Sequence, residues 1–281
     1  MKKIIAVFDG YHISKSTLAY AEEVAYTTNA HLVGCFLDEF IYRSYSVTEV
    51  YKQYKKNPEA VIKQLDEADN KKRDEAVRKF EQSCSRAKIS YSVHRNKSIA
   101  LQELKHESMF ADLIIISGHE TFNRFKQKPP THFIKDLLAD VQCPVLIVPD
   151  AYKPLDKITL LYDGTPSSVF AVKMFSYLFG EYNELPIEVF TVKSGQPDTL
   201  RLPDNRLMRE FIKRHFSKAE YIVVKGDPEQ QILGHLRNHK GNEMVVLGAY
   251  RRSELSRWFK TSMADILMRE LDTVLFIAHN K

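Results

Sequence analysis

The residues of this chain that could do chemistry gather in three segments of its second half. Asp163-Gly164-Thr165, Val192 and Gly248-Ala249-Tyr250-Arg251-Arg252-Ser253 each lie at or just after the end of an apolar run. The Asp163 carboxylate could contact an adenosine or a metal ion, or it could begin the next helix as an Asx turn. The Arg251 guanidinium could hold a phosphate through two hydrogen bonds. Together these residue types indicate a binding site for a small ligand.

The sequence motifs typical of enzymes and metal sites are missing. Among the ten histidines there is no HExxH spacing. His235 and His239, four residues apart on an expected helix, are interpreted as a polar helix face. The sequence also has no GxSxG elbow, no Walker A loop and no glycine-rich dinucleotide fingerprint. We therefore expect neither catalysis nor a bound metal.

Short apolar runs must form the strands that position the three segments. They are mostly β-branched, lack alternating polar residues, and stand at residues 4–8, 113–116, 145–148, 158–161, 245–247 and 274–277. Such runs are typical of parallel strands that helices cover on both faces. Helical patterns at Thr17–Ala25 and Val169–Phe175 each follow the first strand of a half, which predicts a doubly wound α/β sheet. Ligands bind such a sheet outside the carboxyl ends of its strands, where the three segments should meet.

The chain reads as one module written twice. Three stretches recur: Ile4–Gly10 as Ile158–Gly164 and Val33–Leu37 as Ile187–Thr191, both after 154 residues, and Leu113–His119 as Glu243–Ala249 after 130 residues. A duplicated chain can pack its halves about a pseudo-twofold axis, as a homodimer does. It can also keep a site in one half and lose it in the other.

We expect two α/β modules, at residues 1–150 and 155–281, joined by the short linker Pro149–Pro154. Each should be a mostly parallel five-stranded sheet with helices on both faces. The closing strands, at residues 145–148 and 274–278, should pair or abut, because an exposed apolar edge strand would invite aggregation. Helix starts are expected where a capping residue precedes proline, at Thr165-Pro166, Asp227-Pro228 and Asn57-Pro58.

The change of offset between the halves is explained by a helical insertion at about residues 40–85 of the first module. It contains four tyrosines, Tyr42, Tyr45, Tyr51 and Tyr54. One interpretation is a loop and helix face packed over the edge of the sheet. The other is a contact surface for a partner or a second subunit.

Composition narrows the classes of function. A net charge of +5, with basic and acidic residues interspersed, favours a solvated surface over nucleic-acid binding. Cys35, Cys84 and Cys143 form no CxxC motif and are expected to be reduced thiols in a cytoplasmic protein. No stretch approaches the roughly 18 apolar residues of a membrane span, and the first apolar run ends at Asp9, too early for a signal peptide.

From Gly248 onward the chain resembles the universal stress protein family. In that family the fourth strand is followed by glycine, two residues, glycine, nine residues, then glycine and serine or threonine. Gly248 stands at the first glycine, Arg251 at the second and Thr261 at the third, while Ser262 keeps the hydroxyl. Gly226-Asp227-Pro228 before a helix and Cys143–Pro149 at the end of the first half also fit.

The resemblance covers essentially the whole chain, once per half. It implies two tandem Rossmann-like modules of the adenine nucleotide alpha-hydrolase-like type. It also implies a cytoplasmic, non-enzymatic role in the stress response and dimers that meet at the closing strands. In nucleotide-binding members the glycine loop wraps the phosphates of ATP. The binding residues that the resemblance implies here are Asp163, Val192, Gly248, Tyr250, Arg251, Ser262 and Met263.

Departures from the family pattern leave two alternatives for the second half. Glycine lets a backbone approach phosphate closely, and arginine at 251 does not. Either Arg251 replaces the lost backbone contacts, so that ATP, another adenine nucleotide or another small anion binds, or Arg251 fills the pocket by pairing with an acid such as Asp163. In the second case the protein would be an interaction scaffold with both sites filled by side chains.

The first half fits the family's loop less well. Counting to its last glycine and hydroxyl gives Thr131 and His132. Glu120 brings a charge of the same sign as phosphate, and Pro129 and Pro130 remove two N–H donors. We therefore expect a degenerate site in the first half.

Overall fold

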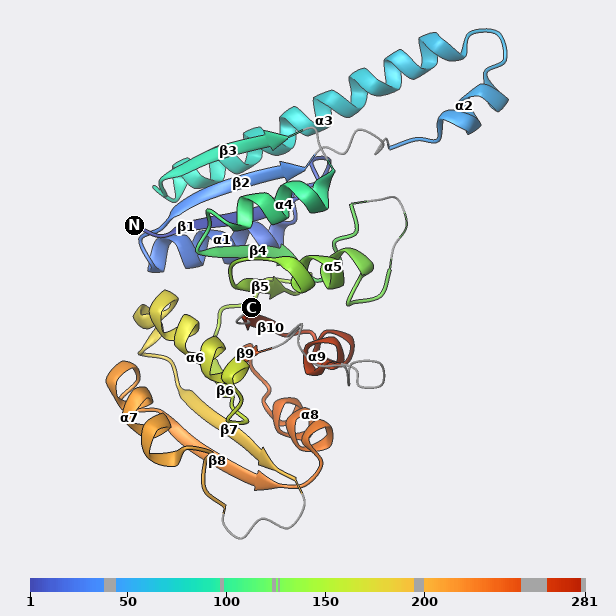
Figure 1. The fold of residues 1–281 in the computed structure, drawn as a ribbon. Coiled ribbons are helices and arrows are strands. Elements are labelled where there is room, and N and C mark those ends of the chain that lie inside the picture. The colour runs from blue at the N-terminus through green and yellow to red at the C-terminus, as the bar shows by residue number, and fades with distance from the viewer. Residues whose placement is uncertain are drawn as a thin grey trace.

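The computed structural model describes residues 1–37, 44–96, 99–122, 125, 127–194, 200–248 and 262–278, and Tyr42, Tyr250, Arg251 and Thr261 lie outside them (Figure 1). The described residues form a ten-stranded sheet with helices on both faces, as expected of an α/β fold. The strand order is β3-β2-β1-β4-β5-β10-β9-β6-β7-β8, so each half is a five-stranded sheet.

The first half contains β1 (Lys3–Phe8), α1 (Lys15–Thr27), β2 (His31–Leu37), α2 (Val47–Gln53), α3 (Pro58–Arg86), β3 (Tyr91–Asn96), α4 (Ala100–Ser108), β4 (Leu113–Ser117), α5 (His132–Asp140) and β5 (Val145–Val148). The second half contains β6 (Lys157–Leu161), α6 (Pro166–Leu178), a short 3₁₀ turn η1 (Gly180–Tyr182), β7 (Ile187–Lys193), α7 (Asn205–His215), β8 (Glu220–Lys225), α8 (Pro228–Asn238), β9 (Glu243–Gly248), α9 (Met263–Glu270) and β10 (Val274–Ala278). Strands within each half are parallel, as the apolar runs predicted.

The closing strands β5 and β10 pair antiparallel, which confirms the expectation that they meet. Leu146 pairs with Phe276, its own counterpart in the repeat, and Val145 and Ile147 pair with Ile277 and Leu275. Each strand therefore meets the other in a self-complementary register, as an isologous dimer interface would. All nine residues of the two strands are buried.

Sheet register corrects the gap-free alignment of the two halves at the second strand. Ile4 pairs with Leu32, whereas its counterpart Ile158 pairs with Ile187. The counterpart of Ile187 is therefore Leu32 and not Val33. A slip of one residue exchanges the faces of a strand, and sequence similarity among apolar residues does not detect it.

The fourth strands carry the same shift. Leu113 pairs with Ile4 and Met244 with Ile158, so Leu113 matches Met244 and not Glu243. Gly248, which aligns with Gly118 in the sequence, therefore corresponds to Ser117 at the end of β4, and Gly118 follows that strand.

Two apolar layers hold the helices to the sheet. One contains side chains of α1, α3, α6 and α7, and the other those of α4, α5, α8 and α9. All three expected helix starts are confirmed, since α3, α6 and α8 begin at Pro58, Pro166 and Pro228. Thr165 and Asp227 accept hydrogen bonds from the backbone N–H groups of Ser168 and Gln230, whereas Asn57 makes no such bond. Cys35, Cys84 and Cys143 are free and buried, as predicted. Within the described residues no helix is long and apolar enough to cross a membrane.

The insertion packs on the sheet only in part. The carboxyl-terminal half of α3 is anchored by Phe80, whose ring lies so close to Gly34 that a Cβ there would be 2.7 Å from it. The rest of α3, with α2, projects beyond the sheet (Figure 1). There the Tyr45 hydroxyl donates to Asp66 at 2.6 Å, which is a packing role, while Tyr51 and Tyr54 are exposed. The interpretation as a helix over the sheet edge therefore holds for one end of α3 only.

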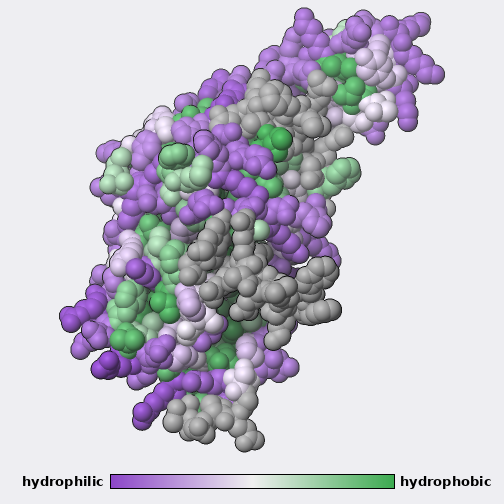
Figure 2. All heavy atoms as spheres, in the orientation of Figure 1, coloured by the Kyte–Doolittle hydropathy of each residue, from purple (hydrophilic) through white to green (hydrophobic). Residues whose placement is uncertain are grey.

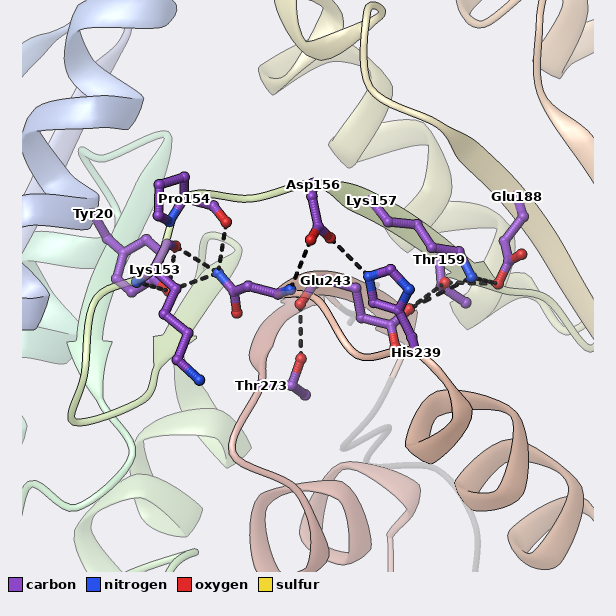
Figure 3. Close-up of polar contacts among 11 residues, drawn as sticks. Tyr20, Lys153, Pro154, Asp156, Lys157, Thr159, Glu188, His239, Glu243 and Thr273 are labelled. Atoms are coloured by element: carbon purple, nitrogen blue, oxygen red, sulfur yellow. Dashed lines mark hydrogen bonds and ion pairs between the residues drawn. The ribbon is translucent and has the colours of Figure 1, made fainter.

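A polar junction at Tyr20, Lys153 and Pro154 ties the second half to the linker and to the first half (Figure 3). Asn242 Nδ2 donates to the Tyr20 hydroxyl at 3.0 Å and to the carbonyl oxygens of Lys153 and Pro154 at 2.6 and 3.4 Å. Tyr20 belongs to α1, is fully buried, and donates in turn to the Lys153 oxygen at 3.0 Å. Buried polar atoms without a partner are costly, so this junction depends on Asn242.

We predict that Asn242→Leu, a change of similar volume, lowers the free energy of unfolding by about 1–3 kcal/mol. The Tyr20 hydroxyl and the carbonyl groups of Lys153 and Pro154 would lose the Asn242 amide, and only Lys153 would keep a second donor, the Tyr20 hydroxyl. Urea denaturation measures the change. The control is Asn238→Leu at the exposed end of α8, which should stay within about 0.5 kcal/mol. Equal losses in the two variants would contradict a role for Asn242 in joining the halves.

Candidate ligand-binding site

A pocket of about 390 Å³ opens at the carboxyl ends of β6, β7 and β9. The strand order reverses here, since β6 leads to β7 on one side and pairs with β9 on the other. Helices α8 and α9 contribute Pro228, Ile232 and Met263 to its wall. The volume lies in the range of small-molecule sites, and the place is the one that open α/β sheets use for ligands.

Asp163 lines the pocket and also builds the turn into α6. Its Oδ1 accepts hydrogen bonds from the N–H and the hydroxyl of Thr165 at 2.9 and 2.7 Å. Gly164 between them has φ +83°, and a Cβ there would lie 2.5 Å from Pro203. The Asx-turn interpretation of Asp163 is therefore confirmed, and the carboxylate still lines the pocket.

Gly248 lines the pocket at the end of β9, where the first turn of α6 presses against it. A Cβ at Gly248 would lie 2.4 Å from the carbonyl oxygen of Ser167. The helix cannot withdraw without breaking its contacts with the sheet, so this position requires glycine. The glycine therefore has a packing role.

Helix α9 starts beside the pocket, with Ser262 as its N-cap residue. Among the described residues, the Ser262 hydroxyl makes no capping bond to this helix, and Met263 lines the pocket. Asp265 in the first turn lies 4.0 Å from Lys135 Nζ of α5. Its negative charge at a helix N-terminus opposes an anion, whereas the ion pair with Lys135 offsets part of that effect.

The structure brings together most of the residues predicted for the site. Asp163, Val192, Gly248 and Met263 all line the pocket, and Ser262 is next to Met263. Tyr250 and Arg251 lie outside the described residues, as does the proposed pairing of Arg251 with Asp163.

Sequence reasoning missed the apolar wall of the pocket. Leu161, Phe190, Ile232 and Leu247 line it, and Ser168 and Ser194 add hydroxyl groups. The sequence did hold a signal for these residues. Leu161 and Leu247 are the last residues of predicted strands, and Ile232 follows the predicted helix start at Asp227-Pro228. From the ends of the strands, Val192 of β7 was the one apolar side chain among the predicted site residues.

A buried polar network lies on the same face of the sheet, toward the amino ends of the strands (Figure 3). The Thr159 hydroxyl lies 2.8 Å from both Glu188 and Glu243, and Lys157 Nζ lies 2.9 Å from Glu188. Burial alone would raise the pKa of Glu188, but hydrogen bonds from its neighbours outweigh burial and lower it. Burial raises the pKa of Glu243. The network therefore shifts the pKa values of these two carboxyl groups in opposite directions.

The histidines of α8 differ from the expected polar helix face. His235 Nε2 contacts Glu188, and its ring stacks on Phe190 with 4.2 Å between centroids. His239 Nε2 lies 2.7 Å from Asp156 Oδ1. Both rings therefore face carboxylates of the sheet or linker, and helical spacing alone could not predict these distant partners. In the part of the chain that the structure describes, no three ligating side chains gather as a metal site would require.

Protein groups occupy the corresponding edge of the first half. Glu120 Oε1 accepts hydrogen bonds from the backbone N–H groups of Thr121 and Phe122 at 3.0 and 3.2 Å. Phe122 is 3% exposed and packs on Phe133, with 4.5 Å between ring centroids. Glu120 thus places its own carboxylate on N–H donors of the loop that, in the resemblance, would hold phosphate.

The Glu120 carboxyl group titrates near neutral pH. Burial and the charge of Asp9 raise its pKa to about 7, against hydrogen bonds that lower it. Burial also raises the pKa of Asp9, whose Oδ1 accepts from the N–H groups of Tyr11 and His12 at 2.9 and 2.7 Å. A phosphate would be a third negative group beside this pair, which supports the expectation that the first site is degenerate.

Comparison with known proteins gives a fold but no sequence relative. No protein-family model and no curated protein sequence matches the chain. A universal stress protein from Archaeoglobus fulgidus DSM 4304 superposes with a TM-score of 0.69 at 14% identity, covering 99% of this chain and 98% of that one. The chain has the universal stress protein fold.

A protein of unknown function from Pseudomonas aeruginosa PAO1 is also similar, with a TM-score of 0.63 at 14% identity, covering 99% of this chain and 92% of that one. Both superpositions span the two halves of this chain. The two structures therefore share the tandem arrangement of the modules as well as the fold of each module.

We predict that Glu120→Gln flattens the pH dependence of stability. With a pKa of about 7 in the folded chain and an ordinary value of 4.5, the folded state binds the proton more tightly. The wild type therefore loses stability as pH rises from about 4.5 to 7, by on the order of 3 kcal/mol, and glutamine does not titrate. Urea denaturation at a series of pH values measures the difference.

The matched control is Glu184→Gln in an exposed turn, whose pH profile should follow the wild type. Parallel profiles of Glu120→Gln and the wild type between pH 5 and 8 would contradict the conclusion that burial and Asp9 raise the pKa of Glu120.

Proposed function

We propose that this chain is a tandem universal stress protein whose second half binds an adenine nucleotide or a related small anion, with ATP as the leading candidate. The observation that carries the proposal is the pocket at the end of β6, β7 and β9, lined by four residues that the family resemblance implies. The modules span residues 1–150 and 155–281, and binding serves a regulatory purpose without catalysis.

The walls of the pocket suit a nucleoside. Phe190, Ile232 and Leu247 offer an apolar surface to a planar base, while Asp163 and Ser194 offer polar atoms to a sugar. A mostly apolar pocket with a few convergent polar groups is typical of cofactor sites.

The anion end of the site would lie at the start of α9. Backbone N–H groups of a helix N-terminus hold phosphate. The Ser262 hydroxyl, whose oxygen accepts no capping bond among the described residues, can donate its proton to the same anion. Arg251 supplies the positive charge that offsets Asp265 in this proposal. In this proposal these groups hold and orient the ligand.

The proposal also includes a cellular compartment and an oligomeric state. Three free, buried thiols suit a reducing compartment, and we place the protein in the cytoplasm. A further dimer of the tandem chain belongs to the same proposal, since members of the family meet in pairs.

We predict that Arg251→Ala weakens ATP binding by about 10- to 100-fold, the usual effect of losing a charge-assisted hydrogen-bonded pair. Glu120→Ala should leave the affinity unchanged, because Glu120 belongs to the first half. Isothermal titration calorimetry with Mg-ATP measures both.

A pocket-filling variant, Val192→Trp, separates the site from the role of Arg251. It should abolish ATP binding whether or not Arg251 contacts phosphate, because its side chain would occupy the pocket. Undiminished binding by Val192→Trp, with a native circular dichroism spectrum, would show that ATP binds elsewhere or nowhere specific.

A further inference from the structure

Two acidic side chains lie buried close together behind the wall of the candidate pocket. Hydrophilic residues cover much of the visible surface (Figure 2), whereas Glu188 and Glu243 are 5% and 4% exposed and Thr159 between them is fully buried. Side chains two residues apart on a strand share a face of the sheet. Glu188 therefore lies next to Phe190 of the pocket wall on the same face of β7. The acids form a polar layer beneath the pocket.

The contacts of Thr159 require one more proton than two ionised carboxyl groups would leave (Figure 3). Its Oγ1 lies 2.8 Å from Glu188 Oε1 and 2.8 Å from Glu243 Oε2. A hydroxyl group donates one hydrogen bond, and an ionised carboxylate only accepts. A second carboxylate at this distance would face the hydroxyl oxygen with no hydrogen between them. One of the two carboxyl groups is therefore protonated and donates to Thr159.

The surroundings of the two acids assign this proton to Glu243. Glu188 Oε1 lies 2.9 Å from Lys157 Nζ and contacts His235 Nε2, and these donors favour a carboxylate. Lys157 Nζ is 3.9 Å from Glu243 Oε2, which is too far for a hydrogen bond. Burial raises the pKa of Glu243, and although burial acts on Glu188 as well, hydrogen bonds from its neighbours lower its pKa. Glu243 thus donates to Thr159, and Thr159 donates to Glu188.

The other charged groups that the structure describes around the two acids are exposed or paired with one another. They are Glu220 of β8 beside Glu188, His239 of α8 with Asp156 of the linker at 2.7 Å, and Arg237 of α8 with Glu270 of α9 at 2.9 Å, to which Arg269 adds a contact at 3.6 Å.

Helix α8 covers this polar layer and also forms part of the pocket. His235 contacts Glu188 and stacks on Phe190, with 4.2 Å between ring centroids, and Ile232 one turn earlier lines the pocket. If Glu243 ionised, two like charges would share a buried layer, which is unfavourable. Water could solvate them only if α8 moved away from the sheet. The proton on Glu243 therefore favours the closed position of this helix.

We propose that Glu243 is a proton-operated latch for helix α8: the neutral acid lets the helix close over the sheet, and loss of its proton as pH rises loosens the helix and the pocket wall that it forms. The effect on a ligand rests on the proposed function, whereas the proton and the loosening of α8 need no ligand. The closed state binds the proton more tightly than an open state does. Its stability is therefore full below the ordinary value of 4.5 and falls as pH rises through the raised pKa of Glu243.

The test compares the wild type with Glu243→Gln, whose amide keeps the shape and the donor but does not titrate. Infrared spectroscopy of the wild type minus this variant should show the carbonyl stretch of a protonated carboxyl group at pH 5, and this band should fade as pH rises. Glu120 contributes equally to both proteins and cancels. The matched control is Glu220→Gln, at an exposed position on β8, which should retain the wild-type band. Absence of the band in the difference spectrum at pH 5 would overturn the proposal.

Hydrogen exchange measures the movement of α8. Between pH 5 and 8, the protection factors of residues 228–238 should fall about threefold or more further in the wild type and in Glu220→Gln than in Glu243→Gln. An equal fall in all three proteins would contradict the latch.

Calorimetry with Mg-ATP tests the link to the pocket. Its affinity should fall more between pH 5 and 8 in the wild type than in Glu243→Gln, and the titration of ATP itself affects both proteins equally. The same pH dependence in both proteins would show that the latch does not act on the pocket. If Mg-ATP binds neither protein, the proposed function fails, and the infrared and exchange results still decide the latch.

Discussion

The antiparallel pairing of β5 with β10 is the constraint on which the rest of the molecule depends. Residues 145–147 meet residues 275–277 in a self-complementary register, so two parallel sheets become one. The pairing satisfies the backbone groups of two apolar strands that would otherwise be exposed edges. Because every residue of both strands is buried, neither half could lose the other without exposing this surface. Asn242 and Tyr20 add a polar junction on the linker beside it.

Within this frame the two halves have diverged at equivalent edges of the sheet. The second half keeps a pocket between Asp163, Phe190 and Gly248. In the first half Glu120 occupies loop N–H donors and faces Asp9, and Phe122 is buried beside it. A single chain tolerates this asymmetry because the pairing of β5 with β10 involves neither site.

Much of this arrangement could be predicted from local patterns. Buried parallel strands read as continuous apolar runs, and Thr165 and Asp227 mark helix starts because their side chains cap the first turn. The site position followed from strand order, and four predicted residues line the pocket. The repeat itself was visible, although the register of β7 and β9 was misjudged by one residue, since apolar side chains on opposite faces look alike in a sequence.

Other features depend on contacts between distant parts of the chain. Gly248 was interpreted as a phosphate-loop glycine, but its requirement here is the approach of Ser167 in α6. His235 was assigned to a polar helix face, and its partner Glu188 lies on a strand 47 residues earlier. The projection of α3 beyond the sheet could not be predicted either, because its charged, periodic pattern suits a covering helix and a free arm equally well.

The central claim is that one half of this chain binds an adenine nucleotide and the other half cannot. The most direct test is native mass spectrometry of the intact protein across an ATP titration, with denaturation to identify any ligand retained from purification. The account predicts a single bound nucleotide per chain at saturation. Two nucleotides per chain would contradict the occupied first site, and none would contradict the ligand-binding second half.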